Sequence, residues 1–136
     1  MSEEERIARR WFEQGWNERD ESVVDELMAP DVAGHMAHGR VEGIDAFKQV
    51  RAAFLAAFPD LRLEVEEVLT APGRAAVRWL FTGTHTGEGF ELAPTGQPVR
   101  VRGTSWVHLR DGQIAAGWDT WDMGTLFARL REVAAE

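Results

Sequence analysis

The sequence predicts an α+β fold in which helices gather on one face of a curved antiparallel sheet. Apolar residues recur at helical spacing up to Pro59, and beyond it they alternate with polar residues at a period of two. With 136 residues, the chain fits one domain over residues 1–136. Because such a sheet bends around the helices that cover it, we expect a cone-shaped molecule that encloses a pocket.

Three helices are expected before the sheet. Ser2 and Glu5 have the spacing of a capping box, so a first amphipathic helix should span residues 3–17. A second, shorter helix must end at Pro30, because proline cannot continue a helix. A third helix is expected over residues 44–58, where large apolar residues again recur every three or four positions.

The remaining segments are assigned by composition and period. Residues 31–43, DVAGHMAHGRVEG, are too rich in glycine for a regular element and are expected to form a loop or a short irregular strand. Residues 90–98 should form a loop at the rim of the sheet, and residues 124–134 a final helix. Four antiparallel strands complete the order, at about residues 61–66, 77–81, 99–109 and 113–121.

The composition excludes several classes of function. A net charge of -8 argues against a nucleic-acid surface, which needs clustered Lys and Arg. The lack of cysteine excludes thiolate nucleophiles and disulfides, and the lack of tyrosine excludes a phenolic acid. The N-terminus has no apolar signal-peptide core, and no apolar run approaches the roughly 20 residues of a membrane helix. We therefore expect a cytoplasmic protein without a nucleic-acid or membrane partner.

Strand alternation selects the residues that face the pocket. Trp79 and Phe81 share one face of their strand, and that face continues to His85. On the next strand the same face carries Gly103, which leaves room, and Ser105. His85 either binds a substrate oxygen or is hydrogen-bonded at the edge of the core. Ser105 is either a weak donor or a small core hydroxyl.

The turn before the last strand decides which of two aspartates enters the pocket. A three-residue loop, Arg110 to Gly112, would pair odd with odd residues and bring Asp119 and Trp121 inward. A two-residue Asp-Gly loop would bring Asp122 inward instead. The sequence favours the first alternative, which leaves Asp122 to cap the last helix.

Asp119 is the candidate catalytic residue. A carboxyl enclosed by Trp and Phe loses hydration, which raises its pKa toward the range where it can exchange protons near neutral pH. The alternative is a buried Asp satisfied by Thr or His partners. His35 and His38 have the spacing of a metal pair, but no third ligand is evident, so no metal is expected.

Several segments over nearly the whole chain carry a family resemblance: RRWFEQGWN, APDVAGH, FPDLRLEVEEV, VRWLFTGTHTGE, PTGQPVRVRG, and the Asp-Gly turn followed by IAAGWDTWD. They resemble the SnoaL-like polyketide cyclases, or ester cyclases, of the nuclear-transport-factor-like superfamily. The resemblance implies a curved sheet closed by helices, an oligomer, and ring closure by aldol condensation on a polyketide methyl ester without metal or cofactor.

The resemblance also implies roles for single residues. The acid/base aspartate of these cyclases corresponds to Asp119. A histidine that accompanies it corresponds to Ser105 in this chain, and an asparagine corresponds to Gly34, so the family substrate does not carry over. His35 and His85 match histidines that are common in the wider family.

The leading hypothesis is a lyase or isomerase in which Asp119 removes and returns a proton α to a carbonyl. His35 and His85 would orient the substrate oxygen, and the walls would be formed by Trp16, Trp79, Phe81 and Trp121. Epoxide or ester hydrolysis would require Asp122 in the cavity. A non-catalytic module that binds a hydrophobe or dimerises is the third alternative. We also expect at least a homodimer. It should form through the exposed face of the sheet, which carries Trp106 and, in the favoured hairpin register, Trp118.

Overall fold

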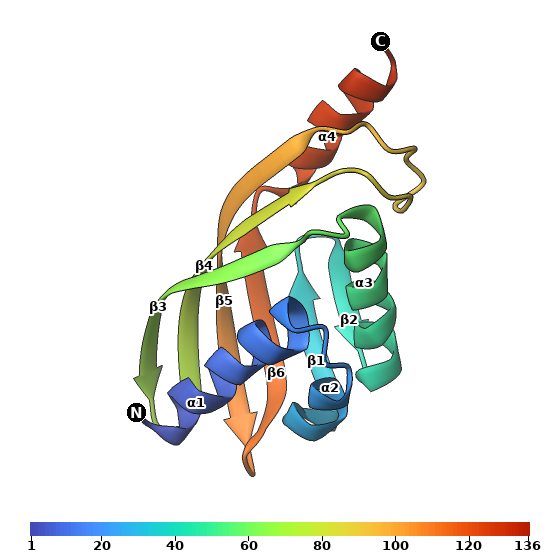
Figure 1. Cartoon of the computed structure of the whole chain (residues 1–136). Helices are drawn as coiled ribbons and strands as arrows, with labels where there is room; N and C mark the ends of the chain where they lie inside the picture. Colours follow the sequence, from blue (N-terminus) through green and yellow to red (C-terminus); the bar gives the residue numbers. More distant parts are fainter.

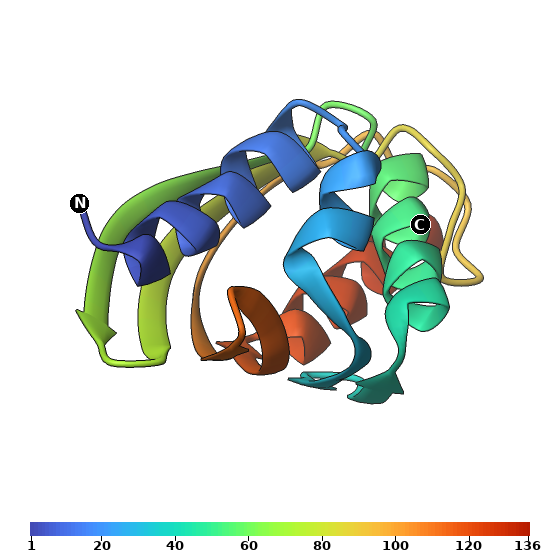
Figure 2. The same ribbon diagram turned by 90° about the horizontal axis from the view of Figure 1, so that it is seen from below.

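The computed structural model describes residues 1–136, and its central feature is a curved, open sheet of six strands in the order β2-β1-β6-β5-β4-β3. Figure 2 shows the sheet bending around α1, with α2 and α3 closing the same side. The elements follow the chain as α1 Glu3–Arg10, the π-helix η1 Trp11–Asn17, α2 Ser22–Leu27, β1 Met28–Met36, β2 Gly39–Glu42, α3 Ile44–Ala57, β3 Arg62–Ala71, β4 Arg74–Thr84, β5 Pro98–Arg110, β6 Gln113–Trp121 and α4 Met123–Ala134 (Figure 1). The α+β prediction is confirmed.

The first helix begins as expected but does not remain an α-helix. The Ser2 side chain accepts a hydrogen bond from the Glu5 N–H and caps α1. From Trp11 onward the helix is a π-helix, so the prediction of an uninterrupted α-helix over residues 3–17 was wrong. At 3.6 residues per turn, residues five apart point about 140° apart, whereas i→i+5 bonding brings them toward one face. Trp11 and Trp16 thereby lie with ring centroids 6.4 Å apart.

Residues 28–42 form two strands, where the sequence suggested the end of a helix followed by a loop or a short irregular strand. β1 pairs in parallel with β6 and antiparallel with β2, so the sheet has six strands rather than the expected four. Pro30 lies near the start of β1, where the register against β6 is interrupted between Met28 and Ala33. The pairing with β6 connects segments about eighty residues apart, and local composition carries no signal of it.

The strands β3 to β6 form the expected antiparallel meander, although β3 and β4 extend further than the alternation indicated. Val77, Trp79 and Phe81 are buried on the concave face, as predicted. They pack with apolar residues of α1, α3 and α4 in one core cluster. A second cluster lies between α2, α3 and β1.

The β5–β6 hairpin has the predicted register but not the predicted loop. Arg110 pairs with Gln113, so the loop has two residues, Asp111 and Gly112, with φ of 53° and 75°. A bulge restores the odd pairing, because Leu109 pairs with Ile114 while His108 pairs with Ala116. Beyond the bulge odd residues face odd residues, and Ser105 lies opposite Asp119.

The C-terminal helix starts where the sequence placed it. The Asp122 carboxylate accepts a hydrogen bond from the Thr125 N–H at 3.0 Å and caps α4. None of the helices combines the length and the apolar character needed to cross a membrane.

Candidate functional site

A cavity of about 100 Å³ lies between the concave face of the sheet and the helices. Its wall is mostly apolar, and its aromatic part comes from η1, α3 and the strands β4 and β6. Aromatic rings pack edge-on and stacked around it, for example Phe81 and Trp121 at 5.8 Å. The lining includes four of the six tryptophans of the chain: Trp11, Trp16, Trp79 and Trp121. Because the lining is mostly apolar, the few polar side chains inside this cavity are the candidates for chemistry.

Asp119 is the carboxylate of this cavity. It lies on β6 opposite Ser105 of β5, and its Oδ1 accepts a hydrogen bond from the Ser105 hydroxyl at 2.5 Å. No protein group donates to Oδ2, because this hydrogen bond is the only one that the side chain makes. One carboxyl oxygen is therefore fixed by the protein and the other remains free for a ligand.

Burial raises the pKa of the Asp119 carboxyl above its usual range, because the apolar wall disfavours the charged form. The Ser105 hydrogen bond and the charge of His38 act in the opposite direction and lower the pKa. The loss of hydration is the largest of these effects, so the pKa remains raised.

A chain of hydrogen bonds orients the two side chains. The Trp79 indole N–H donates to the Ser105 oxygen at 3.0 Å, and the Ser105 hydroxyl proton goes to Asp119. A hydroxyl has one proton to donate, so Ser105 has none left for a ligand. While Asp119 is ionised, Oδ1 accepts this bond and Oδ2 is the oxygen that is free to take a proton.

Of the expected wall residues, Trp16, Trp79, Phe81, Ser105 and Trp121 all line the cavity, but Gly103 does not. A Cβ at Gly103 would overlap the indole of Trp79 and would lie 2.9 Å from the Trp121 Cβ. The space that Gly103 leaves is therefore taken by the Trp79 ring rather than kept for a ligand.

His85 is buried but does not line the cavity. Its Nδ1 accepts a hydrogen bond from the Thr95 N–H at 3.2 Å and lies 2.9 Å from the Thr95 hydroxyl oxygen. Burial lowers the pKa of His85, consistent with the neutral form. The His85 backbone also bonds to Gln97 and Gly96, so this residue anchors the loop between β4 and β5.

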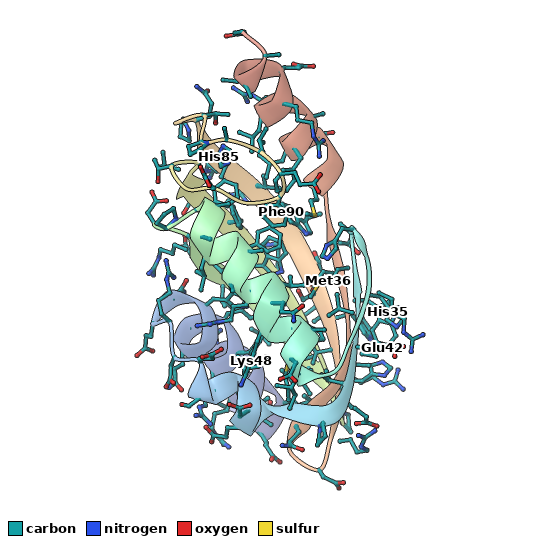
Figure 3. All side chains as sticks on the ribbon, turned by 90° about the vertical axis from the view of Figure 1, so that its right-hand side faces the viewer. His35, Met36, Glu42, Lys48, His85 and Phe90 are labelled. Atoms are coloured by element: carbon teal, nitrogen blue, oxygen red, sulfur yellow. The ribbon has the colours of Figure 1, made fainter.

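His35 and His38 lie on opposite sides of the sheet. His35 stacks on Trp118, with ring centroids 5.0 Å apart, and faces away from the cavity. Figure 3 shows His35 at the outer side of the sheet and its neighbour Met36 toward α3. Met36 and His38 both line the cavity.

Sequence reasoning missed His38 as a site residue, although a signal was present. Val32, Gly34, Met36 and His38 are spaced by two and all line the cavity. Had residues 31–43 been identified as strands, the alternation would have separated His38 from His35.

Asp122 lies outside the cavity, at the start of α4. The site therefore holds one carboxylate rather than a pair. No three side chains among the histidines, aspartates and glutamates are grouped so as to hold a metal ion.

Comparison with known proteins places the chain among small cone-shaped proteins. The family model described as SnoaL-like polyketide cyclase matches residues 6–130. No curated protein matches the sequence significantly.

Solved structures are similar over almost the full chain. A proposed SnoaL-like polyketide cyclase from Jannaschia sp. CCS1 has 26% identity and a TM-score of 0.86, with 98% of this chain and 93% of that chain covered. AclR from Streptomyces galilaeus, a proposed hydroxylase, has 30% identity and a TM-score of 0.83, with 97% and 98% covered. IdmH from Streptomyces antibioticus, a proposed polyketide cyclase, has 24% identity and a TM-score of 0.80, with 96% and 99% covered.

Proposed function

The chain belongs to the SnoaL-like polyketide cyclase family, and from this membership we propose that it is an enzyme acting on a small carbonyl compound. Asp119 serves as the general base and then as the general acid in an aldol-type ring closure, which is lyase or isomerase chemistry. The observation that carries the proposal is a single carboxyl in an apolar cavity, with one oxygen held by Ser105 and the other free.

The proposed reaction needs one proton carrier. Oδ2 of ionised Asp119 takes a proton from a carbon α to a carbonyl, and the electron pair of the broken C–H bond forms the enolate. The enolate carbon attacks a second carbonyl of the same molecule, which forms a C–C bond and an alkoxide. Asp119 returns its proton to the alkoxide oxygen, so that the product has the mass of the substrate.

The cavity wall supports this chemistry in two ways. Exclusion of water by the aromatic side chains strengthens each polar contact to the developing enolate. Flat rings such as Trp16 and Trp121 offer stacking surfaces for a planar substrate. His35 and His85, which lie outside the cavity, take no direct part, and the proposal requires no cofactor.

The test measures proton abstraction separately from ring closure. Aromatic ketones such as 2-acetylnaphthalene exchange their α-protons in D₂O, and the rate is followed by NMR with and without the protein. Asp119→Asn should reduce catalysed exchange by at least about 100-fold. Asp122→Asn is the matched control and should retain the rate. Equal rates for Asp119→Asn and the wild type would contradict the assignment.

Hydroxylation is a second candidate, favoured by the 30% identity to AclR. Hydroxylation would insert one oxygen atom from O₂ and consume two electrons from an added reductant such as NADPH, with water as the second product, whereas ring closure leaves the mass unchanged. Mass spectrometry of products from a panel of aromatic polyketide esters, incubated with O₂ and that reductant, separates the two. Hydrolysis by paired carboxylates is not favoured, because Asp122 lies outside the cavity. A module that only binds a hydrophobe would show neither proton exchange nor product.

We also propose that the protein works as a homodimer. Trp106 and Trp118 face each other across β5 and β6 on the convex side, and 47% and 36% of their surfaces are exposed. His35 and His108 both contact Trp118. An aromatic group of this kind on an outer face is typical of a protein interface.

A further inference from the structure

A second hollow adjoins the cavity at its mouth. We call it the vestibule. It has a volume of about 340 Å³ and is lined from the turn after β1, from β2, from α3 and from the loop after β4 by residues that include His38, Arg40, Glu42, Gln49 and Phe90. Phe90 lies beside α3 (Figure 3), where its ring packs on Phe54 at 4.8 Å. His38 and Val50 line both the cavity and the vestibule, so these two residues mark the passage between them.

The volumes indicate that a substrate of ordinary size occupies both spaces. Sites for drug-sized ligands have volumes of roughly 300 to 1,000 Å³, whereas the cavity around Asp119 has about 100 Å³. A substrate whose reactive carbon reaches Asp119 therefore extends outward past His38. Its inner part meets an apolar wall, and its outer part meets a mixed wall in which four polar residues lie among five apolar ones.

The charged and polar side chains of the vestibule determine which chemical groups the outer part of the substrate can carry. The Arg40 guanidinium is already paired with the Glu42 carboxylate, with Nε and Oε1 2.7 Å apart. An anionic group would have to compete with Glu42 for it. His38 and Gln49 make no hydrogen bond within the protein and remain free to bind a ligand. The imidazole of His38 and the amide of Gln49 offer N–H donors, and Gln49 also offers a C=O acceptor, which suit a carbonyl, hydroxyl or amide.

We infer that the vestibule is a substrate subsite for the neutral, oxygen-bearing end of a molecule whose apolar end fills the cavity, and that His38 donates a hydrogen bond to that end. The inference rests on the proposed function, which places the reacting carbon at Asp119. It adds a specificity residue and a requirement on the substrate: an apolar body joined to an uncharged polar tail.

The neighbouring histidine provides a matched control. His35 lies three residues before His38 on the same hairpin, but it faces the convex side and stacks on Trp118. His35→Ala and His38→Ala remove the same side chain from opposite sides of the sheet. His38 is exposed in the turn after β1, so its removal leaves the core intact.

The experiment compares three ligands by isothermal titration calorimetry. Ethylbenzene carries the apolar end alone, 6-phenylhexanamide adds a neutral polar tail, and 6-phenylhexanoate adds a charged tail. The wild type should bind the amide more tightly than the carboxylate. His38→Ala should weaken amide binding about tenfold, the effect of losing one hydrogen bond, and should change ethylbenzene binding less than twofold. His35→Ala should leave all three affinities unchanged.

Two results would overturn the inference: tighter binding of the carboxylate than of the amide by the wild type, or equal effects of His38→Ala and His35→Ala on the amide. The proposed function fails separately. Asp119→Asn should retain the preference for the amide while it loses α-proton exchange. If the wild type shows no exchange but His38→Ala still weakens amide binding selectively, the subsite stands and the catalytic proposal does not.

Discussion

The behaviour of Asp119 depends on two neighbours that compete. The apolar wall raises the pKa of its carboxyl, and the hydrogen bond from Ser105 lowers it. Trp79 fixes the direction of that bond by donating to the Ser105 oxygen. The serine therefore favours the ionised carboxylate inside an apolar cavity, and it leaves Oδ2 free to take a proton.

Removing the serine hydroxyl tests this balance. In Ser105→Ala the Asp119 carboxylate loses its only hydrogen bond, so we expect its pKa to rise further. An NMR titration of protein labelled at the aspartate carboxyl carbon measures the pKa directly, and Asp119→Asn assigns the signal. The pH profile of α-proton exchange should therefore move to higher pH in Ser105→Ala, by about one pH unit, as expected for the loss of one hydrogen bond of about 1.4 kcal/mol.

Thr104→Ala is the control for this titration, because Thr104 is the exposed neighbour on the opposite face of β5. It should leave the Asp119 signal unchanged. A pKa of Asp119 that is unchanged or lower in Ser105→Ala would contradict the role of the hydroxyl.

The two aspartates should affect stability in opposite directions as pH changes. The pKa of Asp119 is raised in the folded chain, mainly by burial. The folded state therefore binds more protons than the unfolded state between the ordinary value of about 3.9 and the raised one. The stability that Asp119 contributes is present below the unfolded value and is lost as pH rises through the folded one. Asp119→Asn should accordingly gain stability over the wild type as pH rises from about 4 through the raised folded-state value.

Asp122 has the opposite sign. The Thr125 backbone N–H lowers the pKa of Asp122, so its contribution is present above the unfolded value and is lost as pH falls through the folded one. Asp122→Asn should therefore be less stable than the wild type at pH 7, and the difference should shrink on acidification. Urea unfolding at several pH values measures both differences. A pH-independent difference for Asp119→Asn would contradict its raised pKa.

Strand alternation predicted some side-chain positions correctly and could not predict others. The odd face of β5 and β6 placed Asp119 beside Ser105 correctly, although the bulge rather than the turn produces that register. His85 was correctly expected to lie inward, but only the folded loop shows that Thr95 occupies its ring nitrogen. His38 was missed because its segment was not recognised as a hairpin.

At the scale of elements, two glycines lie at positions where an aromatic ring packs against a strand. Gly34 on β1 lies under Phe47, and Gly103 on β5 lies under Trp79. Such contacts join strands and helices that are distant in sequence. Composition alone suggested a loop or a short irregular strand for the glycine-rich segment around Gly34, whereas in the fold it belongs to the regular strand β1, which lies close to α3.

Gly103→Ala should disturb this packing. The added methyl group overlaps Trp79, which must move toward the cavity, and we expect a loss of about 1–3 kcal/mol in the free energy of unfolding. Binding of ethylbenzene should weaken as well. Gly124→Ala on α4 meets open space and should stabilise the protein by about 0.5–1 kcal/mol. Chemical denaturation compares the two, and equal stabilities would contradict the packing account.

At the scale of the whole molecule, the sheet separates two kinds of surface. Its concave side holds Asp119 and the cavity, and its convex side carries the aromatic group around Trp118. The sequence predicted both sides from alternation, because that pattern is local. It could not predict the two added strands, which require pairing of β1 with β6.

The convex aromatic group gives the last prediction. Trp106 lies opposite Trp118 in the register of β5 and β6, so a charge at position 106 would enter the middle of the proposed dimer interface. Trp106→Glu should weaken association at least about 30-fold, as expected when a central tryptophan worth about 2 kcal/mol is lost.

Leu69→Glu is the control, since Leu69 is 65% exposed on the distant edge strand β3. Sedimentation equilibrium should give the mass of two chains for the wild type and Leu69→Glu, and the mass of one chain for Trp106→Glu at low micromolar concentration. A wild type that sediments as one chain at all concentrations would contradict the dimer. The exposed aromatic face would then not be explained as an interface between two copies of the chain.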